Sequence, residues 1–326
     1  MTVAIVFNEH SHLQAKLLQD LASQVMRLFR GARFITCRGY GHQYVPGSTV
    51  LTVEENPDYK LRLATMVNTL LSNKPDYLVS VGGDGLASYI ASTVVVSSDK
   101  VCLLGIAAGT ANVGPIVSFS TEGLAGLKLS DLEEVPLDGI SVSDDSGYLG
   151  VGFNDVILGN SFLGTKDGVC CNLSVEELLM HQKRVAIEVG TNVVTKNFNV
   201  TVVGEERPFF NSIPITQIVI SPLQFDRLYG RAVFGGLCLG RDSQHLAALG
   251  LSTRNVVDSS PDTWDYKGFT AIQHLVFSKG CEVALSGLGP DAHVIIDGNP
   301  FLRKGTVRIS LIPGAVKALK PKRGLL

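Results

Sequence analysis

The sequence predicts a parallel α/β domain over residues 1–140, followed by an all-β, sandwich-like domain over residues 141–300. Before residue 141, apolar strand-like runs alternate with helix-like runs, which is typical of a parallel sheet covered by helices. After it, short strand-like runs are separated by glycine, proline and asparagine, as in a sandwich or barrel. A last strand near the C-terminus predicts that residues 301–326 return to the first domain, and the length of 326 residues suits two cores.

The elements of the first domain follow from the period of its apolar residues. Short β-branched runs indicate strands, and apolar residues at helical spacing indicate helices. Ser11 is expected to cap the first helix and Gly31 to end it. Leu61 is expected on the buried face of the second helix, and residues 39–57 are expected to be irregular. The expected strands cover residues 3–7, 33–37, 77–81 and 100–106, and the expected helices cover residues 13–29, 57–72 and 86–96.

The second domain is expected to consist mainly of strands. Two runs, residues 174–182 and 241–249, are read as helices. The remaining apolar runs are short and bounded by turn-forming residues, which favours strands. These expected strands cover residues 148–154, 184–190, 197–203, 216–222, 229–235, 269–278, 282–286, 293–297 and 306–311.

A glycine-rich segment, Gly82-Gly83-Asp84-Gly85, separates the strand at 77–81 from the helix at 86–96. A turn with so few side chains can lie flat against a phosphate chain, with amide N–H groups and a helix N-terminus facing the anion. Asp84 can then hold Mg²⁺ or accept a hydroxyl proton. The alternative is an ordinary turn, because a short glycine motif alone is not specific.

A second small-residue turn, at residues 107–112, follows the next expected strand. Its backbone at Gly109 and its side chains of Thr110 and Asn112 can contact phosphate oxygens, and the side chains can also donate to a purine edge. Neighbouring parallel strands open their loops at one carboxyl edge, where ligands bind in open α/β folds. Asn8 follows the first strand and is a further candidate for nucleotide contact, with an ordinary turn asparagine as the alternative.

These motifs resemble the ATP-NAD kinase-like superfamily, which includes NAD kinases and diacylglycerol kinases. The resemblance rests on GGDG at residues 82–85 and GTAN at 109–112. Within the superfamily, the continuation through STEGLAGL at 120–127 is similar to the acetoin-catabolism protein X group. The segments NDVI at 154–157 and DGNP at 297–300 resemble later superfamily motifs. The resemblance implies a Rossmann-like domain and a β-sandwich-like domain, with a nucleotide cleft between them and a homodimer or homotetramer as the assembly.

The sequence departs from the superfamily pattern at defined positions. Leu86 stands where a threonine usually follows GGDG, so one phosphate-binding hydroxyl is absent. The usual Asn-Glu pair is Asn154-Asp155, with a carboxylate that is one methylene shorter. The segment that shapes the nicotinamide ribose site in NAD kinases has no counterpart. The nucleotide-binding half of the resemblance is therefore better supported than the acceptor half.

The resemblance implies an ATP- and Mg²⁺-dependent kinase. ATP would bind along Gly82, Gly83, Gly85 and the turn at 109–112, with Asp84 as the catalytic carboxylate. Asn154 and Asp155 would grip the substrate, for which NAD, phosphorylated at a ribose hydroxyl, is the expectation. The alternative reading of this pair is two strand-end residues that bond to their own turn. The alternative functions are a kinase for another metabolite or a lipid alcohol, and a nucleotide-binding protein without catalysis. The metal ligands stay undetermined.

Composition limits the partners and the compartment. The formal net charge is −2 and no basic patch stands out, so nucleic acid and anionic membranes are not expected as partners. No apolar run is long enough to span a bilayer. The six cysteines form no CxxC pair, which favours reduced thiols in the cytoplasm. The apolar run at residues 230–237 predicts at least a homodimer, joined through residues after 141.

Four further features are ambiguous in the sequence. Glu9, His10 and His12 are read as solvated loop residues rather than as metal ligands. The pair at residues 144–145 is read as a solvated turn. Trp264 is expected either to stack on a base or to close a domain edge. The DG dipeptide at 297–298 is a hairpin signal, and by the resemblance it also lies near the active site.

Overall fold

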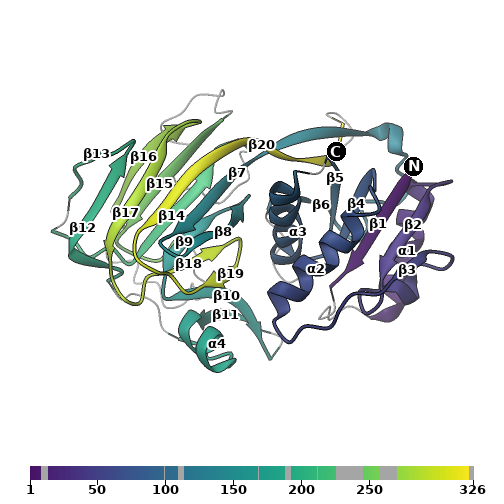
Figure 1. Ribbon diagram of the computed structural model, residues 1–326, viewed down its shortest axis with the longest axis horizontal. Helices are drawn as coiled ribbons and strands as arrows, with labels where there is room; N and C mark the ends of the chain where they lie inside the picture. Colours follow the sequence, from purple (N-terminus) through teal and green to yellow (C-terminus); the bar gives the residue numbers. More distant parts are fainter. Residues whose placement is uncertain are drawn as a thin grey trace. The chain divides into compact units, whose positions relative to one another are not determined.

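The computed structural model describes residues 1–8, 14–98, 100–108, 114–167, 169–187, 192–210, 212–224, 245–256 and 270–322 (Figure 1). The chain divides into two compact units. The first contains Met1–Leu137 and Gly314–Leu326, and the second contains Asp138–Pro313. The division lies three residues before the expected boundary at 140, and residues 301–313 belong to the second unit.

The first unit is built on a parallel sheet. Its strand order is β20-β5-β4-β1-β2-β3, and every neighbouring pair in that order runs parallel. A short strand, β6, also pairs with β5 in parallel. The strands are β1 (Thr2–Phe7), β2 (Arg33–Cys37), β3 (Thr49–Leu51), β4 (Tyr77–Gly82), β5 (Cys102–Ala107), β6 (Val117–Phe119) and the C-terminal part of β20 (Val307–Pro321).

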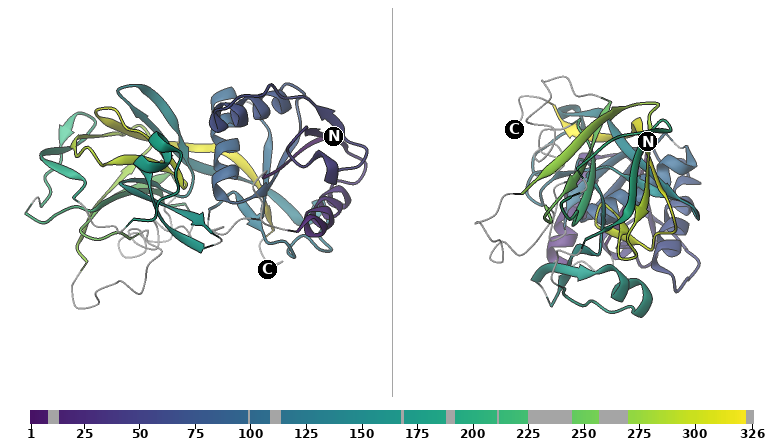
Figure 2. Two further views of the ribbon diagram at one scale, coloured as in Figure 1. Left: turned by 90° about the horizontal axis from the view of Figure 1, so that it is seen from below. Right: turned by 90° about the vertical axis from the view of Figure 1, so that its left-hand side faces the viewer.

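Helices cover both faces of this sheet. Helix α1 (Ala15–Leu28) lies on one face, and α2 (Tyr59–Leu71) and α3 (Asp84–Ser97) lie on the other (Figure 2). Val3, Ile5 and Phe7 of β1 share a core with the buried side of α1, because alternate residues of a strand face the same side. Two short 3₁₀ helices, η1 (His42–Tyr44) and η2 (Leu129–Asp131), complete the unit.

Three helix details differ from the sequence-based expectation. Helix α1 begins after Gln14, whose side chain makes no capping bond, so the prediction that Ser11 is the cap is wrong. Leu61 is 56% exposed, and Leu63 is buried instead. The reason is helical phase, since Leu63 is spaced three, four and seven residues from the buried Met66, Val67 and Leu70. Helix α3 begins two residues earlier than expected, at Asp84.

The second unit is an antiparallel β sandwich. One sheet has the order β16-β15-β14-β9-β18-β19. In the other, β17 pairs with β20, β12 with β17 and β13 with β12, all antiparallel. The elements are β7 (Leu132–Asp144), β8 (Gly147–Gly152), β9 (Val156–Gly159), β10 (Ser161–Lys166), β11 (Val169–Ser174), α4 (Val175–His181), β12 (Val194–Val202), β13 (Glu205–Glu206), β14 (Gln217–Pro222), β15 (Leu246–Ser252), β16 (Ile272–Ser278), β17 (Glu282–Leu288), β18 (His293–Ile296) and β19 (Asn299–Phe301).

The six-stranded sheet is buried on both faces. One face shares a core with β7, β12, β17 and β20, and contains Leu158, Ile218 and Leu249. The other face contains Ile157 and Val219, and the β10–β11 hairpin and helix α4 pack on it. The predicted fold class, a parallel α/β domain with a sandwich-like β domain, is confirmed.

Double burial explains one wrong prediction. Residues 241–249 were expected to be helical, but β15 covers Leu246–Ser252, and six of its seven residues are buried. A strand buried on both faces has no alternating pattern, so its apolar run cannot be told from a helix by period alone. Residues 184–190 were expected to form a strand, and the structure shows an isolated bridge between Leu173 and Ala186. Strands β7 and β10 were not predicted.

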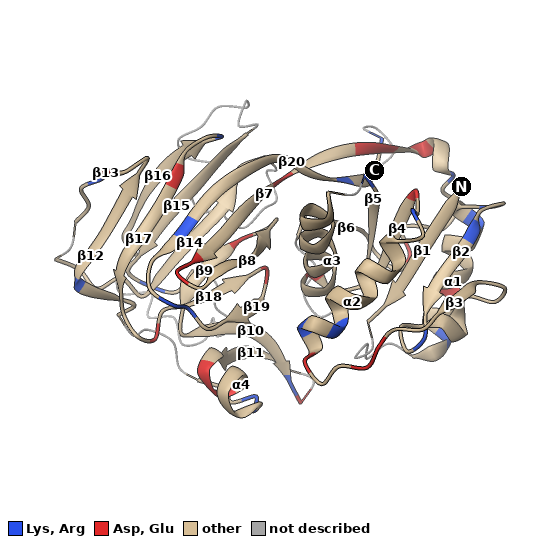
Figure 3. Ribbon diagram, viewed as in Figure 1, with Lys and Arg blue, Asp and Glu red and all other residues tan. Residues whose placement is uncertain are grey.

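Several predicted features lie outside the described residues. They are Glu9, His10 and His12, the turn residues Gly109, Thr110 and Asn112, the run at 230–237, and Trp264. Among the described residues, the longest helices have 14 residues, and no helix is long and apolar enough to cross a bilayer. Acidic and basic residues are distributed over the elements of both units (Figure 3).

Candidate functional site

The carboxyl ends of β1, β4 and β5 lie at one edge of the parallel sheet. Asn8, directly after β1, donates its backbone N–H to the carbonyl of Val81 at 2.9 Å. Ala108, directly after β5, donates its backbone N–H to the carbonyl of Gly82 at 2.9 Å. The predicted glycine turns therefore follow neighbouring parallel strands, as expected from the sequence.

This edge also contains the point where the strand order reverses. The chain passes from β1 to β2 on one side of the sheet, and from β4 to β5 on the other. In open α/β sheets, the crevice outside such a reversal, at the carboxyl ends of the strands, is where ligands bind. Asn8 and Gly82 lie at this reversal, because β1 and β4 are neighbours.

The GGDG segment forms the start of helix α3. Gly82 ends β4, and Gly83 is the N-cap residue with an extended backbone, φ −93° and ψ 177°. Asp84 and Gly85 already belong to the helix, so the bare turn is shorter than expected. The first N–H groups of a helix have no partner within it, and its dipole favours negative charge. The segment thus places a helix N-terminus at the carboxyl edge of the sheet.

Asp84 connects this helix start to the segment after the second predicted turn. One carboxylate oxygen, Oδ2, accepts the backbone N–H of Gly114 at 2.9 Å. A Cβ atom at Gly114 would lie 2.9 Å from Oδ1 of Asp84, so a side chain there would displace the carboxylate. The sequence analysis did not single out Gly114, although this glycine, two residues after the GTAN segment, is visible in the sequence.

Leu86 stands where the superfamily usually has a threonine hydroxyl, and its side chain packs against Gly82. Its side chain is buried, and a Cβ atom at Gly82 would lie 2.9 Å from its Cδ2 and 3.3 Å from Cβ of Asn8. Gly82 is therefore explained by close packing against these two side chains.

A lysine from the C-terminal strand also reaches this region. The Lys320 ammonium donates to the backbone carbonyl of Pro115, the residue after Gly114. Strand β20 runs parallel to β5, with Ala318 opposite Leu103, so its end lies at the carboxyl edge of the sheet. Burial lowers the pKa of the Lys320 side chain to about 8. The sequence offers one weak signal, a lysine directly after an apolar strand-like run.

A second cluster, in the other unit, contains Asn154, Asp155 and Asp297. The Asp297 carboxylate accepts three successive backbone N–H groups, from Phe153 at 2.7 Å, Asn154 at 2.8 Å and Asp155 at 2.9 Å. In return, the N–H of Asp297 donates to the carbonyl of Asp155 at 3.0 Å. Asp297 and Gly298 have φ values of 45° and 79°, which fits the tight β18–β19 hairpin that the DG dipeptide predicted.

The Asn154–Asp155 pair is buried and internally bonded. The Asn154 amide donates to a carboxylate oxygen of Asp155 at 2.6 Å, and both residues are 6% exposed. Ser221 donates its hydroxyl to the Asn154 carbonyl at 2.6 Å. Within the described part of the chain, the side-chain oxygen Oδ1 of Asn154 accepts no hydrogen bond. The pair bonds to its own turn, as the structural alternative expected, and the Asn154 Oδ1 atom is buried.

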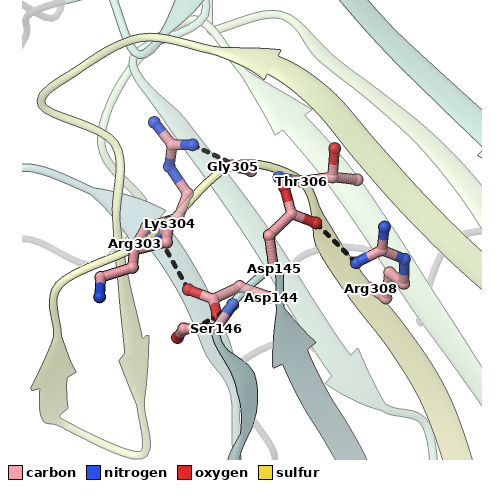
Figure 4. A network of polar contacts seen from close by, with 8 residues as sticks. All are labelled: Asp144, Asp145, Ser146, Arg303, Lys304, Gly305, Thr306 and Arg308. Carbon is pink, nitrogen blue, oxygen red and sulfur yellow. Dashed lines mark hydrogen bonds and ion pairs between the residues drawn. The ribbon is translucent and has the colours of Figure 1, made fainter.

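The acidic pair at 144–145 is a structural clamp, so the prediction of a solvated turn is wrong for Asp144, which is 4% exposed. Asp144 accepts the N–H of Lys304 at 2.6 Å and the N–H and hydroxyl of Ser146 at 2.8 and 2.6 Å (Figure 4). Burial raises the pKa of Asp144, but these hydrogen bonds lower it more, so the net pKa lies below its ordinary value. Asp145 bonds to Arg308 at 2.9 Å.

Metal binding is limited by the available side chains. Among the described residues, no group of three or more His, Cys, Asp or Glu side chains is placed to hold a metal ion. Mg²⁺ is commonly held by one or two carboxylates together with the phosphates of a nucleotide. Asp84 is the carboxylate at the glycine-rich edge that can fill this role.

The comparisons with known proteins agree with this fold. No family model matches the sequence. An uncharacterised protein from Archaeoglobus fulgidus is 27% identical over 260 residues, which cover 77% of this chain and 76% of that protein. Yeast NADH kinase complexed with NADH matches with a TM-score of 0.55 and 11% identity, covering 99% of this chain and 83% of that chain.

A second kind of kinase has a similar structure. A diacylglycerol kinase from Bacillus anthracis str. Sterne matches with a TM-score of 0.53 and 11% identity, over 100% of this chain and 98% of that chain. The chain therefore has the kinase-like fold that is shared by NAD kinase and diacylglycerol kinase-type proteins, as the motif resemblance implied. The closer resemblance to the acetoin-catabolism protein X group stays a prediction.

Proposed function

We propose that the chain is an ATP-dependent phosphotransferase with a hydroxyl acceptor, of the NAD kinase type. The observation that carries the proposal is the glycine-capped N-terminus of α3, placed where the strand order reverses, with Asp84 held beside it by Gly114. The fold likeness to NADH kinase and to a diacylglycerol kinase supports a phosphoryl-transfer role.

The residues of the first unit suit this chemistry. Phosphoryl transfer needs mainly positioning and electrostatic stabilisation, so few side chains are required. The N–H groups at Gly83 and the first turn of α3 bind phosphate oxygens, and the helix dipole favours their charge. Asp84 accepts or orients the proton of the attacking hydroxyl, and its bond to Gly114 keeps the carboxylate in one orientation.

Mg²⁺ fits this arrangement as a cofactor that Asp84 and the nucleotide phosphates hold together. When bound, the ion neutralises the negative charge that the phosphates carry. A single protein carboxylate is consistent with this mode, since the described residues contain no larger cluster of metal ligands.

We propose NAD or NADH as the phosphoryl acceptor, bound by residues of the second unit. Asn154 and Asp155 would contact a ribose hydroxyl, and Asp297 fixes the backbone of this pair. A lipid alcohol is the alternative acceptor, because diacylglycerol kinases share the fold. Incubation with ATP, Mg²⁺ and NAD, NADH or diacylglycerol in turn, with detection of ADP and of the phosphorylated product, identifies the acceptor.

The role of Asp84 is tested by Asp84→Asn, with Asp20→Asn as a matched control. Asp20 lies on the exposed side of α1, so both variants remove one negative charge from the same unit. We expect Asp84→Asn to lower turnover by about 10²-fold or more, and Asp20→Asn to leave it unchanged. Equal turnover of Asp84→Asn and the unaltered protein would refute the assigned role.

Two observations favour a second candidate, a nucleotide-binding protein without catalysis. Asp84 has a structural bond to Gly114, and Leu86 packs where the superfamily usually has a hydroxyl. Both candidates predict ATP binding, so turnover separates them. ATP binding at micromolar concentration, without ADP formation for any acceptor tried, would select the non-catalytic function.

A further inference from the structure

A histidine of the second unit is held by a buried carboxylate. The side chain of Asp138, on β7, is 1% exposed, and it accepts the backbone N–H of His245 at 3.0 Å. The ring atom Nδ1 of His245 lies 3.2 Å from both oxygens of the same carboxylate. The His245 side chain itself is 52% exposed. A carboxylate taken out of water thus holds an imidazole ring that remains accessible.

The backbone of His245 adopts an uncommon conformation at this contact. Its φ is 59°, in the left-handed region that residues other than glycine seldom enter. Such strain persists where surrounding interactions enforce it, and it is concentrated at functional sites. With this backbone, the N–H and the ring of one residue both bond to the Asp138 carboxylate, which fixes the ring in position.

The carboxylate also determines which ring nitrogen of His245 carries the proton. A carboxylate only accepts hydrogen bonds, so Nδ1 is the nitrogen that donates to Asp138. In the neutral ring, the other nitrogen, Nε2, then has a free lone pair. The pair therefore provides a positioned hydrogen-bond acceptor for a hydroxyl group.

Two hydrogen bonds connect the His245–Asp138 pair to the edge of the six-stranded sheet that contains Asn154. Asp138 donates its N–H to the side-chain oxygen of Gln224 at 2.8 Å. Ser221 donates its hydroxyl to the carbonyl of Asn154 at 2.6 Å. Ser221 and Gln224 are three residues apart at the end of β14, so these two contacts lie within about 10 Å of each other along the chain.

The strand register gives the same placement. Ile140 of β7 pairs with Gly152 of β8 in an antiparallel ladder. Asp138 lies two residues before Ile140, and Asn154 lies two residues after Gly152, so both lie beyond the same end of this ladder. His245 directly precedes β15, whose first residues pair with the last residues of β14. The imidazole and the Asn154–Asp155 segment therefore belong to one edge of one unit.

We propose that His245 binds a hydroxyl group of the phosphoryl acceptor, with Asp138 as the residue that positions its ring. The inference rests on the proposed function, in which Asn154 and Asp155 contact the acceptor, and it deepens that function by naming the acceptor class. Several hydrogen-bonding groups at one edge suit a sugar with neighbouring hydroxyl groups, such as ribose. They suit a diacylglycerol less well, because its single hydroxyl would leave polar groups of the site unpaired.

The experiment combines ¹⁵N NMR of the imidazole rings with calorimetric titration of the full chain. The probes are NAD and dioctanoylglycerol, and a non-hydrolysable ATP analogue is present so that NAD does not occupy the proposed ATP site. His245→Asn removes the ring, and asparagine tolerates a left-handed backbone, so the fold is retained. His274→Asn is the matched control, because His274 is exposed and lies within β16 of the same sheet.

A specific response of one ring is expected. NAD should shift the ring resonances of His245 and leave those of His274 unmoved, and dioctanoylglycerol should shift neither. We expect His245→Asn to weaken NAD binding by about fivefold or more, as for the loss of one hydrogen bond to a ligand. His274→Asn should bind NAD as the unaltered chain does.

Asp138→Asn tests the positioning role with a readout that a merely structural residue would not move. The remaining oxygen accepts the His245 N–H, and the new NH₂ group faces Nδ1, which then accepts rather than donates. The proton of the neutral ring should therefore move to Nε2, and the ¹⁵N shifts report this change of tautomer. The loss of NAD affinity should resemble that of His245→Asn and should not add to it in the double variant.

Each outcome decides the proposal. Unmoved His245 resonances with NAD bound, or unchanged NAD affinity in His245→Asn, would overturn it and leave the pair as a tie between β7 and β15. Absence of NAD binding, or a His245 response to dioctanoylglycerol alone, would also overturn it, because the acceptor would not be a sugar of this class. Binding is measured here rather than turnover. A His245 response to NAD without any ADP formation therefore refutes the proposed kinase function and leaves this inference intact.

Discussion

Replacement of Asp297 by asparagine tests whether this residue holds the Asn154–Asp155 segment in place. One oxygen of Asp297 accepts the N–H groups of Asn154 and Asp155, and the other accepts the N–H of Phe153. Asparagine keeps one oxygen and presents an NH₂ group in place of the other. In Asp297→Asn, a donor therefore faces the Phe153 N–H, and the negative charge that strengthens all three bonds is lost.

The magnitude follows from these contacts. A hydrogen bond to a charged acceptor contributes about 1.5–3 kcal/mol, and an unsatisfied buried N–H has a penalty of similar size. We expect Asp297→Asn to lower the free energy of unfolding of the second unit by about 2–4 kcal/mol. For a unit of the size of Asp138–Pro313, this loss lowers Tm by roughly 6–12 °C.

Thermal unfolding and hydrogen exchange provide the assay. Asp291→Asn is the control, because it removes the same charge. Asp291 is exposed and lies near Asp297 in the chain. The amides of residues 153–155 should exchange faster in Asp297→Asn and at the normal rate in the control. If Asp297→Asn melts within about 1 °C of the unaltered protein with its amide protection retained, the clamp interpretation is wrong.

Two further changes test other contacts. Gly114→Ala places a Cβ 2.9 Å from Oδ1 of Asp84, and we expect a loss of about 1–3 kcal/mol in denaturant unfolding. The loss should shrink in an Asp84→Ala background, and equal losses in both backgrounds would disprove the contact. Asp144 has a folded pKa below its ordinary 3.8, so it stabilises the protein above pH 3.8 and loses this effect as pH falls through the lower value. The Tm difference between Asp144→Asn and the unaltered protein should be constant from about pH 7 to 5 and narrow below pH 3.8, and a difference unchanged at low pH would contradict it.

The sequence predicted the parts of the site that depend on neighbours in the chain. The strand, glycine cap and helix of residues 77–97 are encoded by a β-branched run, by residues without side chains and by the apolar run that follows. The hairpin at Asp297-Gly298 is local in the same sense, because a tight turn with positive φ favours these residue types. Neighbouring parallel strands were inferred from the alternation of elements, which constrains topology strongly.

Other features required the tertiary structure. The bond from Asp84 to Gly114 joins residues 30 positions apart, the clamp of Asp297 on Phe153 spans 144, and the contact of Lys320 with Pro115 spans 205. No local pattern contains these pairings, because they depend on the order in which strands enter the sheet. Strand β15 was mistaken for a helix for a related reason, since burial on both faces removes the alternation that marks a strand.

The sequence by itself determined the class of fold and the glycine-rich edge. Both follow from backbone conformations and apolar periods that a few adjacent residues specify. Only the tertiary structure decided what Asp84, Asp297 and Lys320 contact, and hence which charges are held, buried or shifted. The physical reason is that hydrogen-bond partners and burial are properties of the packed chain, and packing joins segments whose separation in the sequence carries no signal of their proximity.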